Sequence, residues 1–138
     1  MKVLDTDTLT LLLKSQSQVV ERWRQEADEI AIAVVTRIEV FQGRFATLLK
    51  AADGAALKRS QDRLDETVRD LLPFAVLPIN DSVAAEFDRL RLVKKLKKIG
   101  RGDLLIAAIV LAHRATLVTR NIKDFRLIPG LLVENWAD

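Results

Sequence analysis

Residues 102–121 read GDLLIAAIVLAHRATLVTRN, and this stretch decides the fold class. Asp103 stands directly before an almost entirely apolar segment, residues 104–114, which predicts a helix that is buried on most sides. The run TLVT at 116–119 is typical of a short buried strand, and Asn121 lies just past it. A buried helix that leads straight into a buried strand is typical of α/β proteins.

The segments on either side continue this alternation. Further strands are expected at residues 3–4, 30–35, 74–79 and 131–133. Helices are expected between them: Thr36 to Glu39 has the form of a capping box, Asn80 begins a cap cluster, and apolar residues spaced from 83 to 96 predict one long helix. Strands alternating with helices imply a parallel sheet with helices on both faces.

The bulk composition limits the class of protein. With 138 residues, 49% of them hydrophobic, the chain suits one compact domain spanning residues 1–138. There is no cysteine, which excludes disulfides, thiolate zinc sites and thiol nucleophiles. No segment has the roughly 18 consecutive apolar residues that a membrane span needs. An acid at position 5 comes too early for a signal peptide, so we expect a soluble, cytoplasmic protein.

Charge is spread unevenly along the chain. The formal net charge is +3, but residues 1–88 carry −4 and residues 89–138 carry +7. Such a basic cluster is expected either to guide a polyanion such as RNA or to be an ordinary solvated helix face. The residues expected to guide RNA are Lys94, Lys95, Lys97, Lys98 and Arg101.

Several polar residues follow the predicted strands, where a parallel sheet places its ligand-binding site. Ligands of open α/β sheets bind at the carboxyl ends of the strands. Asp5 ends the first strand, Glu39 lies one turn into the helix after the second, and Asn121 follows the fourth. Asp103 begins a helix that runs either from that edge or toward it, and the spacing leaves both directions open.

Two of these acids have a structural explanation as well. Glu39 is expected to complete a capping box with Thr36, and Asp103 to be the N-cap of its helix. Asp5 has no such explanation, because an acid that closes an apolar strand is costly to bury unless it is paired or metal-bound. The functional interpretation joins the three carboxylates around Mg²⁺ or Mn²⁺, which prefer oxygen ligands and activate water.

The sequence resembles PIN-domain ribonucleases, in particular the VapC-type toxins of toxin–antitoxin pairs. The resemblance covers essentially the full length, and its specificity lies in the order and separation of its motifs. Those motifs are VLDTD (3–7), TRIEVFQG (36–43), GDLLIAA (102–108), LVTRNIKDF (117–125) and the ending IPGLLVENW (128–136).

The resemblance implies a three-layer α/β/α sandwich with strand order 3-2-1-4-5, and endonucleolytic RNA cleavage with Mg²⁺ or Mn²⁺. By position, Asp5 and Asp103 are similar to the family's direct metal ligands. Glu39 and Asn121 match positions that act on the metal through water, with Thr119 as a polar support. The resemblance also implies a homodimer and a VapB-like antitoxin that blocks the acidic site.

Two positions depart from the pattern of the PIN-domain family. Position 7 is Asp where Asn is usual, and position 121 is Asn where Asp is frequent, which puts a second metal in doubt. Asp124 is expected to hold its loop.

The opening VLDTDT (3–8) is also similar to haloacid-dehalogenase-like phosphatases, in which Asp5 would be the nucleophile, although the glycine usual after the second Asp is absent. The charge asymmetry also permits a non-enzymatic RNA-binding regulatory domain.

Overall fold

Five short strands form one sheet in the order β3-β2-β1-β4-β5 in a computed structural model that describes all residues 1–138. Every neighbouring pair of strands is parallel, which confirms the predicted sheet and its order. The strands are β1 (Lys2–Leu4), β2 (Ile30–Ala33), β3 (Ala75–Leu77), β4 (Thr116–Val118) and β5 (Leu132–Glu134). The helices are α1 (Thr6–Leu13), α2 (Ser17–Gln25), α3 (Val34–Leu49), α4 (Gly54–Leu71), α5 (Asp81–Arg91), the 3₁₀ helix η1 (Lys94–Leu96), α6 (Arg101–Ala112) and α7 (Ile122–Phe125).

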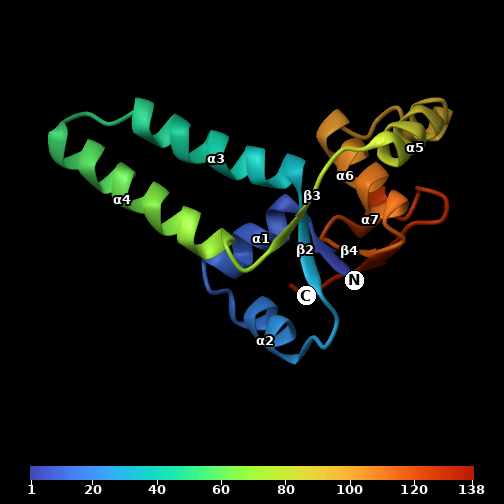
Figure 1. The fold of residues 1–138 in the computed structure, drawn as a ribbon, viewed down its shortest axis with the longest axis horizontal. Coiled ribbons are helices and arrows are strands. Elements are labelled where there is room, and N and C mark those ends of the chain that lie inside the picture. Colours follow the sequence, from blue (N-terminus) through green and yellow to red (C-terminus); the bar gives the residue numbers. More distant parts are fainter.

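Helices cover both faces of this sheet, as an α/β/α sandwich requires. Successive side chains of a strand point to opposite faces, so Val3 and Leu4 of β1 belong to two different hydrophobic cores. The core around Val3 is filled by α5, α6 and the segment around Phe125. The core around Leu4 is filled by α1, α2, the start of α3 and the end of α4. In Figure 1, α1 and α2 accordingly lie on the other side of the sheet from α5, α6 and α7.

Helices α3 and α4 form a long hairpin that projects from the body of the domain (Figure 1). We call residues 34–71 the α3–α4 arm. Several large apolar side chains of the arm are exposed, among them Phe45 at 61% and Leu49 at 71% of their surface. The longest helix, α4, has 18 residues, and no helix in the structure is both long and apolar enough to cross a bilayer.

The second strand and the helix after it divide differently from the sequence prediction. Strand β2 ends at Ala33, and α3 begins at Val34 without any side-chain cap. The predicted strand over 30–35 was therefore too long, and the predicted capping box opening at Thr36 was wrong. The physical reason is tertiary packing, because Thr36 is fully buried inside α3 and its hydroxyl lies 3.1 Å from the Thr6 hydroxyl.

The predicted long helix over residues 83–96 is also divided. Helix α5 ends at Arg91, and Leu96 belongs to the separate 3₁₀ helix η1. Leu96 and Ile99 are nevertheless buried in the core around Val3, so the apolar pattern correctly predicted burial and wrongly predicted one straight helix. The expected cap at Asn80 is confirmed, since its side chain accepts a hydrogen bond from the Val83 amide at 3.0 Å.

Candidate active site

The polar residues singled out in the sequence follow strands that end at one edge of the sheet. Asp5 comes directly after β1, the central strand, and its amide donates to the carbonyl of Val118 at the end of β4. Glu39 lies in α3, which starts directly after β2, and Asn121 lies three residues beyond the end of β4. Parallel pairing therefore brings segments from the start, middle and end of the chain to one place.

Asp5 has a structural role that the sequence did not reveal. It is the N-cap of α1, where its Oδ1 accepts a hydrogen bond from the Thr8 amide at 2.8 Å. Only 6% of Asp5 is exposed. Burial raises the pKa of the Asp5 carboxyl, and hydrogen bonds from Thr119 and Thr8 oppose that rise. The expectation that Asp5 has no capping explanation was therefore wrong.

Asp103, by contrast, lacks the capping role that the sequence predicted. The N-cap of α6 is Gly100, the helix begins at Arg101, and Asp103 lies inside its first turn. The expectation that Asp103 caps this helix was wrong, because the helix starts three residues before its apolar stripe, which begins at Leu104. A carboxylate in the first turn is still favoured by the helix dipole. Helix capping therefore does not explain why the Asp103 carboxylate is half-buried near other acids.

Glu39 is held by a side chain that the sequence analysis did not single out. Its Oε1 accepts a hydrogen bond from the Thr6 hydroxyl at 2.8 Å, which ties α3 to the start of α1. Because α3 begins at Val34, Glu39 completes no capping box with Thr36. Glu39 is thus oriented toward the residue next to Asp5 rather than toward the end of its own helix.

The electrostatics show that these acids lie close enough to act on one another. Burial raises the pKa of Asp103 most strongly, and the negative charges of Asp5, Glu39, Asp124 and Asp7 raise it further. The charges of four carboxylates from three separate parts of the chain therefore act on Asp103. We call Asp5, Glu39 and Asp103 the acidic site.

Asn121, the fourth expected site residue, is engaged in its own loop. It is the N-cap of α7, its Nδ2 donates to Asp124 Oδ2 at 3.1 Å, and its amide donates to the Thr119 hydroxyl at 3.0 Å. No hydrogen bond joins Asn121 to a residue of the acidic site. The bond within the loop agrees with the expectation that Asp124 has a structural role.

The basic segment before α6 is exposed, but it is not a helix face. Lys94 and Lys95 lie in η1, Lys97 and Lys98 follow it, and none of these four forms an ion pair. The guanidinium of Arg101 lies over the ring of Phe87, 5.5 Å from its centre.

The family model described as "PIN domain" matches residues 2–131 of the chain. The chain belongs to the PIN-domain family. The resemblance inferred from the ordered motifs is confirmed, and the competing phosphatase interpretation is set aside.

Relatives of this PIN domain include Ribonuclease VapC1 of Haemophilus influenzae, 27% identical over 98% of this chain and 97% of the relative. The tRNA(fMet)-specific endonuclease VapC of Salmonella typhimurium is 25% identical over 98% and 97% of the two chains. Among solved structures, VapBC2 from Rickettsia felis bound to a DNA fragment from its promoter is similar, with a TM-score of 0.76 and 26% identity over 98% of each chain.

The donor atoms of the acidic site fit a hard divalent cation, although the side chains are not yet arranged around one. No group of three or more carboxylate or imidazole side chains converges closely enough to hold a metal ion. The gathered donors are nevertheless carboxylate oxygens, which Mg²⁺ and Mn²⁺ prefer. A cation among them would relieve the repulsion that raises the pKa of Asp103.

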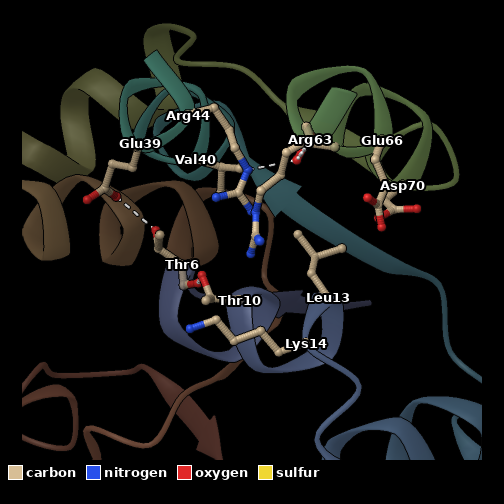
Figure 2. A pocket seen from close by; sticks show the side chains of 12 residues that line it. Thr6, Thr10, Leu13, Lys14, Glu39, Val40, Arg44, Arg63, Glu66 and Asp70 are labelled. Atoms are coloured by element: carbon tan, nitrogen blue, oxygen red, sulfur yellow. Dashed lines mark hydrogen bonds between the residues drawn. The ribbon is translucent and has the colours of Figure 1, made fainter. Parts of the chain in front are cut away.

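Beside the acidic site lies a polar pocket that no pattern in the sequence indicated. Its volume is about 350 Å³, and it lies between α1, α3 and α4 (Figure 2). Thr6 and Glu39 form one side of it, and three cationic residues also line it: Lys14, Arg44 and Arg63. We call it the cationic pocket. Because each cation comes from a different part of the fold, no local run of basic residues marks it.

The capping role of Asp5 leads to a prediction about stability. We expect Asp5→Ala to lower the free energy of unfolding by about 0.5–2 kcal/mol, because the Thr8 amide loses its acceptor. Asp5→Asn keeps an acceptor oxygen and removes a buried charge, so it should match or exceed the wild type. Urea unfolding of the metal-free protein measures both.

Asp53 offers a matched control for that comparison. It caps α4 with the same geometry, Oδ1 to the Ala56 amide at 2.8 Å, but is exposed and lies beside the arm's outer turn. Asp53→Ala should cost a similar free energy, and Asp53→Asn should be nearly neutral. Equal stability of Asp5→Ala and Asp5→Asn would contradict the capping role.

Proposed function

We propose that this PIN domain, acting as one unit over residues 1–138, is an Mg²⁺- or Mn²⁺-dependent endoribonuclease and the toxin of a toxin–antitoxin pair. The observation that carries the proposal is the clustering of Asp5, Glu39 and Asp103 at the carboxyl edge of the sheet, where the acids raise the pKa of Asp103. Relatives that match nearly the whole chain are named as ribonucleases. We also propose a cytoplasmic location, because cellular RNA is the expected substrate.

The residues divide the work of the site between binding and support. In this proposal Asp5 and Asp103 bind the metal directly, and Glu39 and Asn121 contact it through water. The bound metal supplies an activated water and neutralises charge on the phosphate. The Thr8 amide orients Asp5 by donating a hydrogen bond to its Oδ1. Thr6 holds Glu39 next to Asp5, and Asp124 holds Asn121.

The proposed partner is a VapB-like antitoxin, as in the VapBC complexes that this chain resembles in structure. The α3–α4 arm presents an apolar stripe with Ile38, Phe45 and Leu49 on α3 and Leu57 and Val68 on α4, all exposed. An exposed stripe of this kind marks a surface that another protein covers. We assign it to the antitoxin, and we propose that two copies of the toxin pair in the assembled complex.

The exposed basic segment is proposed to attract the RNA backbone. Arg101 lies two residues before Asp103, so Lys94, Lys95, Lys97 and Lys98 approach the acidic site along the chain. Neutralising these lysines is expected to weaken RNA binding and flatten its dependence on salt.

Incubating purified protein with total RNA tests the function directly. Discrete RNA fragments in Mg²⁺ or Mn²⁺, and intact RNA in EDTA, are the expected result. Binding of RNA without cleavage under any metal condition would instead favour a non-enzymatic RNA-binding domain.

Asp7 tests whether its unusual charge matters to the reaction. We expect Asp7→Asn to leave the rate of RNA cleavage largely unchanged, because Asn restores the residue usual in the family. The change also removes one of the charges that raise the pKa of Asp103. Cleavage rates at fixed Mg²⁺ measure the effect, with Asp103→Asn as the inactive reference. Near-total loss of cleavage in Asp7→Asn would mean that Asp7 takes part in the chemistry.

A further inference from the structure

We propose that the cationic pocket is a subsite for a phosphate of the RNA strand other than the phosphate that is cleaved. The inference rests on the proposed ribonuclease function. Its basis is the position of Lys14, Arg44 and Arg63 around one pocket that shares Thr6 and Glu39 with the active-site region.

One of the two arginines is held in place: Arg44 is half-buried, whereas the Arg63 side chain is exposed. Arg44 Nε donates to the Thr67 hydroxyl at 2.9 Å, and Thr67 is buried, with its own hydroxyl donating to the carbonyl of Arg63. Figure 2 shows the guanidinium groups of Arg44 and Arg63 close together in the middle of the pocket, with the Lys14 side chain below them. Helix α4 thus fixes one arginine through Thr67 and supplies the other itself.

Three carboxylates, Glu39, Glu66 and Asp70, line the same pocket, but none of them is paired with these cations. None of the ion pairs includes Lys14, Arg44 or Arg63. Glu66 and Asp70 on α4 also line the pocket, but they lie to one side of the guanidinium groups (Figure 2) and are not paired with them. Two adjacent guanidinium groups repel each other, and an anion between them removes that repulsion.

The chemistry of the pocket favours phosphate as the anion. Guanidinium groups bind phosphate oxygens through paired hydrogen bonds, which an ammonium group alone cannot do. Only Leu13 and Val40 among the 12 lining residues are hydrophobic, so the pocket offers little to an apolar peptide side chain. Its border with Glu39 means that a strand lying across the acidic site passes the pocket as well. RNA carries a phosphate at every nucleotide, so such a strand brings a second phosphate to the arginines.

RNA binding without cleavage tests the subsite. The probe is a fluorescein-labelled oligouridylate, titrated in EDTA over a series of salt concentrations. We expect Arg44→Gln/Arg63→Gln to weaken binding about 10- to 100-fold, the effect of removing hydrogen bonds to a charged group. The slope of log K against log salt should shrink by about 0.7 for each phosphate that the variant no longer neutralises. The double variant Arg44→Lys/Arg63→Lys keeps the charge without the paired hydrogen bonds. Its affinity for the oligouridylate should therefore lie between those of the wild type and Arg44→Gln/Arg63→Gln.

A matched control lies at the outer part of the same hairpin. Lys50→Gln/Arg59→Gln removes two positive charges from exposed positions that do not line the pocket. It should change binding far less than Arg44→Gln/Arg63→Gln, and circular dichroism with thermal melting checks that all variants fold. Equal binding and equal salt slopes in the two Gln double variants would overturn the proposal. So would loss of binding to labelled polyglutamate with RNA binding intact, because the pocket would then be a site for protein carboxylates.

Cleavage assays separate this proposal from the function on which it rests. In a protein that cuts RNA, Arg44→Gln/Arg63→Gln should raise KM and leave kcat nearly unchanged, since the arginines bind a phosphate away from the bond that breaks. If the wild type cuts no RNA but the arginine variant still binds oligouridylate more weakly than the control, the ribonuclease function fails and the phosphate subsite stands. If the wild type cuts RNA and the arginine variant keeps the wild-type KM and binding, the subsite fails and the function stands.

Discussion

Asp103→Asn is expected to lower the rate of metal-dependent RNA cleavage by on the order of 100- to 1000-fold, the effect typical of removing one preorganised electrostatic group from an active site. Asp103 lies in the first turn of α6, half-buried, and the negative charges of Asp5, Glu39 and Asp7 already act on it. Asn has nearly the same size, but it is a poor ligand for Mg²⁺ compared with a carboxylate. The variant therefore loses the cation rather than the shape of the site.

The fold of this variant should be unaffected. Gly100 rather than Asp103 occupies the N-cap of α6, so the change removes no capping bond. Removing one charge also relieves the repulsion within the acidic site, so Tm should stay equal or rise. Asp53→Asn is the control, because it makes the same chemical change at an exposed acid next to the arm's outer turn. Cleavage by Asp103→Asn at the wild-type rate in Mg²⁺ would show that the acidic site is not the active site.

Removing divalent metal is expected to abolish cleavage, and restoring Mg²⁺ or Mn²⁺ should recover it. Metal should also stabilise the folded protein, because only the folded chain brings the carboxylates together. At about 100 times its Kd, the ligand adds about 2.7 kcal/mol, which for a domain of this size raises Tm by roughly 5–10 °C. Thermal denaturation with EDTA and with Mg²⁺ measures this shift. Asp103→Asn should show little of it, and a full shift in that variant would mean that the metal binds elsewhere.

The pH dependence of stability in the metal-free protein is an independent test of the same acids. The pKa values of Asp5 and Asp103 are raised in the folded state, so in the range just above the ordinary carboxyl value of 3.8 the folded chain binds more protons than the unfolded chain. Their contribution to stability is therefore lost as pH rises through the raised pKa values. Metal reverses this trend, because it binds the ionised carboxylates. Tm of the EDTA-treated wild type should fall more steeply with rising pH than that of Asp103→Asn.

The sequence predicted the architecture well because the apolar pattern is strong. The buried helix before β4 and the short apolar strands leave few alternatives to a parallel sheet. The boundaries of helices and strands were harder to predict where the same apolar pattern fits both a strand and a helix. The β-branched pair Val34 and Val35 continues the strand pattern, yet it starts α3, because Thr36 is buried against Thr6.

The acids themselves were found from the sequence, but their separate roles were not. The N-caps of α3 and α6 lie three residues earlier than expected, at Ala33 and Gly100, which removes the capping roles of Glu39 and Asp103. Asp5 caps α1 instead. The cationic pocket could not be found at all, because Lys14, Arg44 and Arg63 come together only when three helices pack. Local sequence carries helix and strand preference, whereas the distance between helices is set by the whole core.

The central place of β1 in the sheet has a consequence for the time at which the protein gains its chemistry. This strand is made before the other four, yet its second neighbour, β4, is made only at residues 116–118, after Asp103. At about 5–20 residues per second, synthesis of the intervening chain takes on the order of 10 s. During that time β1 has only β2 as a neighbour, and Asp5 lacks Asp103 until residue 103 has been made. If the proposed function holds, chains that stop before Asp103 should be unable to cut RNA, so the activity would arise only when synthesis is nearly complete.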